Sequence, residues 1–87
     1  MFMSKIHYYD RIRLRPLPAT ESSEEDDLCI QIVYPQEADA VAGRISAEAP
    51  VGQAALHRKE GETITFSAQG QRMRMKIISI EKHAVTA

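Results

Sequence analysis

The stretch from residue 43 to 61, GRISAEAPVGQAALHRKEG, constrains the fold more than any other part of the chain. Ile45 and Ala47 alternate with polar neighbours, which is the pattern of a half-buried strand. Pro50 follows where the first residue of a helix would lie, because the N–H that proline lacks is unpaired at that position anyway. The sequence therefore predicts a strand that runs directly into a helix.

The predicted helix begins at or near Pro50 and ends before Gly61. Its apolar stripe contains Val51, Ala54 and Ala55, with Leu56 beside it. A helix this short is unstable alone in water, so these side chains must rest on a sheet. The basic residues 57–59 are expected in its last turn, where positive charge suits the helix dipole.

The residue before the proline is Ala49, which has no side-chain acceptor for a helix cap. Compared with a serine at this position, the missing cap should lower the stability of the helix by about 1 kcal/mol, unless Glu48 or a water molecule accepts the hydrogen bond instead.

The rest of the chain shows strand patterns separated by proline and polar segments. Ile12 and Leu14 alternate with arginines before Pro16, and TITF and RMRMKIISIE flank a hairpin turn at AQGQ. LCIQIVYP is predicted to be a central strand, with Cys29 buried in it as a small hydrophobe. The pattern indicates an α+β domain: an antiparallel sheet of four to five strands with one short helix on its apolar face.

Length and composition indicate one small domain that spans residues 1–87. The net charge of −1 gives no general reason to expect nucleic acid or acidic lipid as a partner. A single cysteine excludes an internal disulfide and a multi-cysteine zinc site. No run approaches the ~20 apolar residues of a membrane helix, so no membrane association and a cytoplasmic location are expected.

The ordered segments RISAEAP, VGQAALHRK, EGE, TITF, SAQGQ and RMRMKIISIE resemble the C-terminal domain of the Gre-type transcription elongation factors. In that family a strand like "isvnSP" runs into a helix like "iarALlgk", then "eeGD" and two strands joined by a Gly-containing turn. The resemblance covers about residues 27–81. IQIVYPQEAD and APVGQAAL are closest to the related regulator of nucleoside diphosphate kinase. The chain shows no counterpart of the N-terminal helical hairpin whose acidic tip holds a metal ion in Gre factors, so it is either the globular domain of a larger protein or a stand-alone minimal relative.

The resemblance implies an FKBP-like twisted sheet and a domain that binds the rim of the RNA polymerase secondary channel. The contact residues carried over from the family are those of the turn before the helix: Glu48, Ala49, Pro50 and Val51. Glu48 stands where the family has Asn or Asp, Ala49 replaces a serine, and Pro50 matches. Without a hairpin the domain is expected to be non-catalytic, to need no cofactor or metal, and to compete with cleavage factors.

A second candidate surface consists of basic residues on the first and last predicted strands: Arg11, Arg13, Arg15, Arg72, Arg74 and Lys76. If these strands are neighbours, the charges share one sheet face. They could then bind RNA or an acidic protein, with Tyr8 or Tyr9 stacking on a base. The favoured alternative is that the acidic run at residues 19–27 and Glu62 or Glu81 neutralise them, so direct nucleic-acid binding is not expected.

The acidic run at residues 19–27 is interpreted as an exposed, mobile loop. It lacks the glycine and ligand spacing of an EF-hand, so no response to millimolar magnesium is expected. The three histidines, His7, His57 and His83, show no ligand or triad spacing. A peptidyl-prolyl isomerase is the alternative function that an FKBP-like fold suggests, but the chain has no tryptophan and few aromatic residues to line such a pocket.

Overall fold

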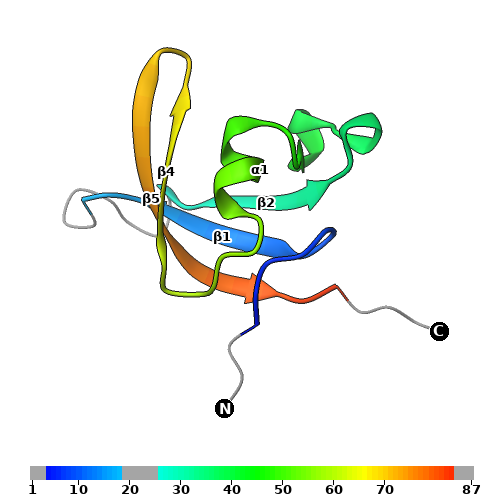
Figure 1. The fold of residues 1–87 in the computed structure, drawn as a ribbon, viewed down its shortest axis with the longest axis horizontal. Helices are drawn as coiled ribbons and strands as arrows, with labels where there is room; N and C mark the ends of the chain where they lie inside the picture. Colours follow the sequence, from blue (N-terminus) through cyan, green and yellow to red (C-terminus); the bar gives the residue numbers. More distant parts are fainter. Residues whose placement is uncertain (1–3, 19–25, 84–87) are drawn as a thin grey trace.

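The computed structural model describes residues 4–18 and 26–83. Within these ranges one five-stranded sheet carries a short helix, α1 (Pro50–Ala55), on one face (Figure 1). The order across the sheet is β3-β2-β1-β5-β4. The strands are β1 (Arg11–Pro16), β2 (Leu28–Val33), β3 (Arg44–Ser46), β4 (Thr63–Ala68) and β5 (Gln71–Glu81). The predicted α+β fold is confirmed.

One strand pairing differs from the expected antiparallel sheet. β1 pairs antiparallel with β2 and β5, and β4 pairs antiparallel with β5, but β2 and β3 are parallel. The chain returns between β2 and β3 through two short 3-10 turns, η3 (Pro35–Glu37) and η4 (Ala40–Ala42). Parallel neighbours require such a crossover, so the sheet is mixed.

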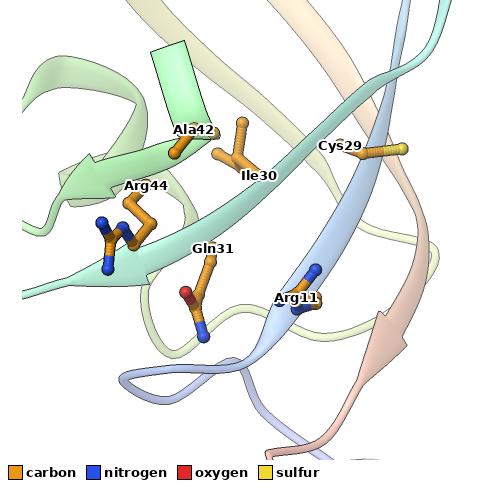
Figure 2. Close-up of a pocket in the computed structure, with 7 residues that line it drawn as sticks. Arg11, Cys29, Ile30, Gln31, Ala42 and Arg44 are labelled. Carbon is orange, nitrogen blue, oxygen red and sulfur yellow. The ribbon is translucent and has the colours of Figure 1, made fainter. Parts of the chain in front are cut away.

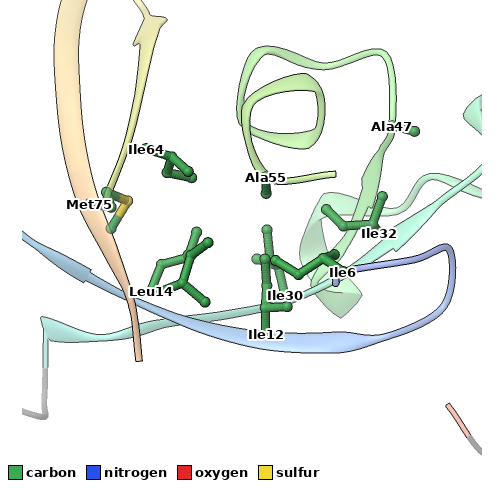
Figure 3. Close-up of a cluster of buried hydrophobic side chains, with 10 residues drawn as sticks. Ile6, Ile12, Leu14, Ile30, Ile32, Ala47, Ala55, Ile64 and Met75 are labelled. Atoms are coloured by element: carbon green, nitrogen blue, oxygen red, sulfur yellow. The ribbon is translucent and has the colours of Figure 1, made fainter. Parts of the chain in front are cut away.

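The alternation predicted for the strands divides the two faces of the sheet. Ile12 and Leu14 of β1 are buried, while Arg11 and Arg13 between and beside them are exposed. Figure 3 shows the buried side chains gathered between the sheet and α1, with Ala55 pointing down onto the cluster. The cluster consists of Ile6, Ile12, Leu14, Ile30, Ile32, Ala47, Ala55, Ile64, Met75 and Ile77.

The prediction that Cys29 is buried is wrong. β2 is an interior strand as expected, but Cys29 is exposed because Ile30 and Ile32 take the inward positions. Residue 29 therefore faces the outer side of the sheet, opposite Arg13 in the register of β1 and β2.

The helix begins at Pro50 as predicted but ends earlier than its basic residues suggest. α1 stops at Ala55, and no basic residue lies in its last turn. His57 has a φ of +70°, and its N–H donates to the Ile6 carbonyl oxygen while the Ile6 N–H donates to Arg58. The chain thus leaves the helix to pair with the N-terminal segment. No helix in the described part is long and apolar enough to cross a membrane.

Asp10 ties the two ends of the described chain together. Its side chain is almost fully buried and accepts hydrogen bonds from the backbone N–H of His7 and of His83, each 2.8 Å long, and from Lys82 Nζ. Burial by itself raises the pKa of Asp10, but these hydrogen bonds outweigh it and hold the pKa below its ordinary value.

Replacing Asp10 by Asn should destabilise the domain by about 2 kcal/mol near neutral pH, because a hydrogen-bonded buried charge is lost. The folded pKa lies below the ordinary value of 3.8, so the stabilisation is present above that value and disappears as pH falls through the folded pKa. Urea denaturation of the wild type and of Asp10→Asn at stepwise lower pH should show converging unfolding free energies. Glu81→Gln, at the exposed end of β5, is the control; a constant gap between wild type and Asp10→Asn would contradict the charge-based account.

Candidate protein-docking site

The turn at residues 48–51, which leads into α1 and includes its first two residues, is held by Ser46 rather than by a helix cap. Ser46 Oγ accepts from the Glu48 N–H, and the Ser46 carbonyl oxygen accepts from the Ala49 N–H, both at 3.0 Å. Ala49 adopts an extended conformation and makes no side-chain cap, as its sequence predicted, and Glu48 does not replace that cap. The end of β3 therefore fixes the direction in which the turn leaves the sheet.

The turn presents two of its four side chains to solvent. Glu48 and Pro50 are exposed, whereas Ala49 and Val51 are half-buried and Val51 packs against the core. Within the described ranges the Glu48 carboxylate has no ion-pair partner. The packing of Val51 against the core therefore anchors the turn, and the turn presents the Glu48 carboxylate to solvent beside the rigid Pro50 ring.

A groove runs between this turn and the edge of the sheet. Its volume is about 420 Å³. It is lined by Glu48, Pro50, Gln53 and Ala54 on one side and by Thr65, Phe66 and Ser67 of β4 on the other. The turn and β4 thus form one continuous surface, with one aromatic side chain in it rather than the several that an isomerase pocket needs.

Gly52 sets the position of α1, and sequence patterns gave no sign of its role. A Cβ atom on Gly52 would lie 2.1 Å from the Ser46 carbonyl oxygen and 3.0 Å from the Ala47 Cα. Both contacts are with backbone, which cannot move aside cheaply. Glycine is therefore required for α1 to approach the end of β3 this closely, and the 48–51 turn depends on that approach.

The predicted basic surface lies on one face, as expected from adjacent β1 and β5. Arg15 is directly opposite Lys76, while Arg11 is opposite Glu81. Arg72 and Arg74 continue along β5 beyond the end of β1, opposite Ser67 and Thr65 of β4. The structure thus brings the basic residues together on the outer side of the sheet, away from α1.

Asp27 neutralises part of this surface. Arg15 donates two hydrogen bonds to its carboxylate, at 2.8 and 2.9 Å, and Arg13 lies 3.7 Å away. The hydrogen bonds from Arg15 hold the pKa of Asp27 below its ordinary value. The Asp27 side chain is only 1% exposed, so the prediction that the acidic loop stays exposed through residue 27 is wrong at this position. Residues 19–25 of that run lie outside the described part.

A shallow hollow of about 310 Å³ crosses the same outer face. Figure 2 shows Arg44 of β3, Gln31 of β2 and Arg11 of β1 side by side on three neighbouring strands, with Cys29 beyond them. Arg44 lies 3.7 Å from Asp39. Glu62, a predicted neutralising partner, instead lies 3.8 Å from Arg58.

The aromatic and histidine residues are engaged elsewhere. Tyr8 stacks on Tyr34 with ring centroids 4.1 Å apart, and Tyr9 Oη donates to Glu37, which raises the pKa of Tyr9 to about 12. His7 and His57 lie with their rings 5.9 Å apart. Over the described ranges no three histidine, cysteine or acidic residues cluster to hold a metal ion.

Comparison with known proteins identifies the domain type. The sequence profile of the family described as "Transcription elongation factor, GreA/GreB, C-term" matches residues 18–82. The chain belongs to this family. GreA of Streptococcus pneumoniae serotype 19F (strain G54) is 38% identical over 64 residues, which is 74% of this chain and 40% of that protein. GreA of Brucella canis (strain ATCC 23365 / NCTC 10854 / RM-666) is 34% identical over 73 residues, 83% of this chain and 46% of that protein.

Solved structures show the same fold for this GreA/GreB C-terminal domain. Thermus aquaticus Gfh1 superposes with a TM-score of 0.77 at 23% identity, over 92% of this chain and 50% of that one. The GreA/GreB factor of Nitrosomonas europaea gives 0.72 at 25% identity, over 94% and 64%. The chain spans less than half the length of the curated relatives it matches. The only α-helix in the described residues is α1, so this part contains no helical hairpin.

Replacing Gly52 by Ala should destabilise the domain by about 2 kcal/mol, because the new methyl group overlaps backbone atoms of residues 46 and 47. At an unconstrained helix position the same change stabilises, so the sign tests the close approach. Gln53→Ala, one position along on the exposed side of α1, is the matched control and should be near neutral. Chemical denaturation of both variants measures the difference, and a stabilised Gly52→Ala would refute the constraint.

Proposed function

We propose that this GreA/GreB C-terminal domain is a non-catalytic module that binds RNA polymerase at the rim of the secondary channel and thereby regulates transcript elongation. Family membership supports a polymerase partner. The observation that carries the proposal is the 48–51 turn, where Glu48 and Pro50 are exposed on a backbone that Ser46 and Gly52 fix. A preformed turn loses little conformational entropy on binding, so even a small contact can be specific.

The chemistry of the turn defines the polymerase surface that it fits. An unpaired carboxylate beside a rigid apolar ring favours a basic side chain next to an apolar patch. Contact through this turn places α1 and β4 against the partner and leaves the basic outer face pointing away. The proposed interface therefore centres on Glu48, Ala49, Pro50 and Val51, and does not include the arginines of β1 and β5.

Occupying the rim without an acidic hairpin tip would make the domain a competitor of cleavage factors. In Gre factors, transcript cleavage depends on acidic residues of the N-terminal hairpin, and no metal-binding cluster lies in the described part of this domain. We also propose the closer kinship with the regulator of nucleoside diphosphate kinase that VYP and APVGQAAL suggest. The similar proteins described above include GreA of Streptococcus pneumoniae and Gfh1 of Thermus aquaticus.

The domain should bind purified bacterial RNA polymerase with a dissociation constant in the micromolar range or weaker, which is a binding free energy of about −8 kcal/mol or smaller in magnitude. Glu48→Lys should weaken binding more than Arg72→Glu, because only Glu48 lies in the proposed interface. Biolayer interferometry on immobilised polymerase compares the two charge reversals, with circular dichroism as the check on folding.

A stalled elongation complex provides the second readout. The domain should leave the transcript uncut and should slow cleavage by an added Gre factor. Loss of polymerase binding in Arg72→Glu together with intact binding in Glu48→Lys would make the outer face the working surface. Cleavage by the domain alone would overturn the non-catalytic role.

A further inference from the structure

The free edge of β4 offers backbone hydrogen-bonding groups, which the proposed polymerase contact through the side chains of the 48–51 turn does not use. In the strand order β4 is the last strand and pairs only with β5, so in the described structure no strand lies beyond it. An edge strand presents a row of backbone N–H and C=O groups that can pair with another chain.

The hydrogen bonds of β5 show which backbone groups of β4 point outward. The Ile77 N–H donates to the Glu62 carbonyl oxygen on the β4 side, whereas the Arg74 carbonyl oxygen accepts from Leu17 on the β1 side. Backbone groups alternate in direction along a strand, so those of Met73 and Met75 point toward β4.

The register then assigns the free groups. Met75 is opposite Ile64 and Met73 is opposite Phe66, so Ile64 and Phe66 use their backbone groups in the ladder with β5. Thr65 and Ser67 therefore direct their N–H and C=O groups to the open edge. Their side chains are exposed on the outer face of the sheet.

This edge lacks the usual protection against pairing. The strand TITFSA contains no charged residue and no proline, which are the residues that commonly block sheet edges. The opposite edge strand, β3, is only three residues long, and its Arg44 exchanges two backbone hydrogen bonds with Asp39. The two edges of the sheet thus differ, and only β4 is long and uncharged.

The groove beside β4 gives an added strand a place for its side chains. On the inner side it would lie along Phe66, Ala54 and Pro50, which form the apolar part of the groove lining. On the outer side its alternate residues would lie beside Thr65 and Ser67. The exposed Arg74 and Arg72 are opposite these two residues, on the next strand. Two strand spacings are about 10 Å, a distance that an arginine and a glutamate side chain span together.

We propose that β4 is a second protein-binding site, which takes an extended segment of a partner protein as an additional strand. The segment has apolar residues toward the groove and acidic residues toward Arg72 and Arg74. This site shares Glu48 and Pro50 with the proposed polymerase contact. Its hydrogen bonds come from the backbone of Thr65 and Ser67, so the proposal does not require that the domain binds polymerase. Strand addition derives its affinity from main-chain hydrogen bonds and its specificity from alternate side chains.

The test uses a capped, fluorescent peptide of alternating valine and glutamate as the probe. Thr65→Pro removes an outward N–H but no bond of the β4–β5 ladder, and an edge strand tolerates proline at such a position. Thr65→Val keeps the N–H and is the matched control. Fluorescence anisotropy should show equal binding to the wild type and Thr65→Val, and roughly tenfold weaker binding to Thr65→Pro.

A second measurement keeps the test decisive if Thr65→Pro fails to fold. Peptides that are N-methylated only on the amides facing β4, or only on the opposite amides, are titrated into wild-type protein. Only the first set should lose binding, and amide hydrogen exchange at residues 65 and 67 should slow with the unmethylated peptide. Equal binding by both methylated sets, or by a serine–glutamate peptide, would show charge attraction to the basic face and overturn the proposal.

Discussion

The close contact between α1 and the end of β3 is the constraint on which the rest of the domain depends. Gly52 lies so near the Ser46 carbonyl oxygen that no Cβ fits between them, and Ala55 rests fully buried on the sheet just beyond. A helix of six residues cannot hold itself together, so its position is set entirely by this packing. Because the helix is fixed, the turn before it is fixed as well, and the exposed side chains of Glu48 and Pro50 acquire a defined direction.

The two sides of the sheet serve different purposes. The inner side carries the apolar cluster, α1 and the 48–51 turn, while the outer side carries the arginines of β1 and β5 in a polar layer. The near-neutral charge of the chain conceals this division, since the basic residues gather on one face. Asp27 neutralises the pair Arg13 and Arg15, and the positive charges on the strand next to the open β4 edge are Arg72, Arg74 and Lys76.

Much of the architecture was accessible from local patterns. The strands at Ile12 and Leu14, the helix start at Pro50 and the turn at Gly70 were each predicted, because period-two alternation and proline or glycine positions reflect nearby geometry. The errors have a common cause. The burial of Cys29 and the placement of residues 57–59 in the last helical turn were wrong, because the burial of a residue and the last turn of a helix depend on which distant segment packs there. The roles of Asp10 and Ile6 were not predicted, since Asp10 bonds to Lys82 and His83 and Ile6 bonds to residues 57 and 58, all far along the chain.

The sequence by itself determined the composition of the elements and the family resemblance, through the order of RISAEAP, VGQAALHRK and TITF. It also determined that the turn before α1 carries a carboxylate and a proline. Only the tertiary structure decided the parallel pairing of β3, the need for Gly52, the buried Asp27 and the free β4 edge. The physical reason is one of range. Alternation and turn chemistry act between neighbours in the chain, whereas close approach, burial of charge and edge position arise only when distant segments meet.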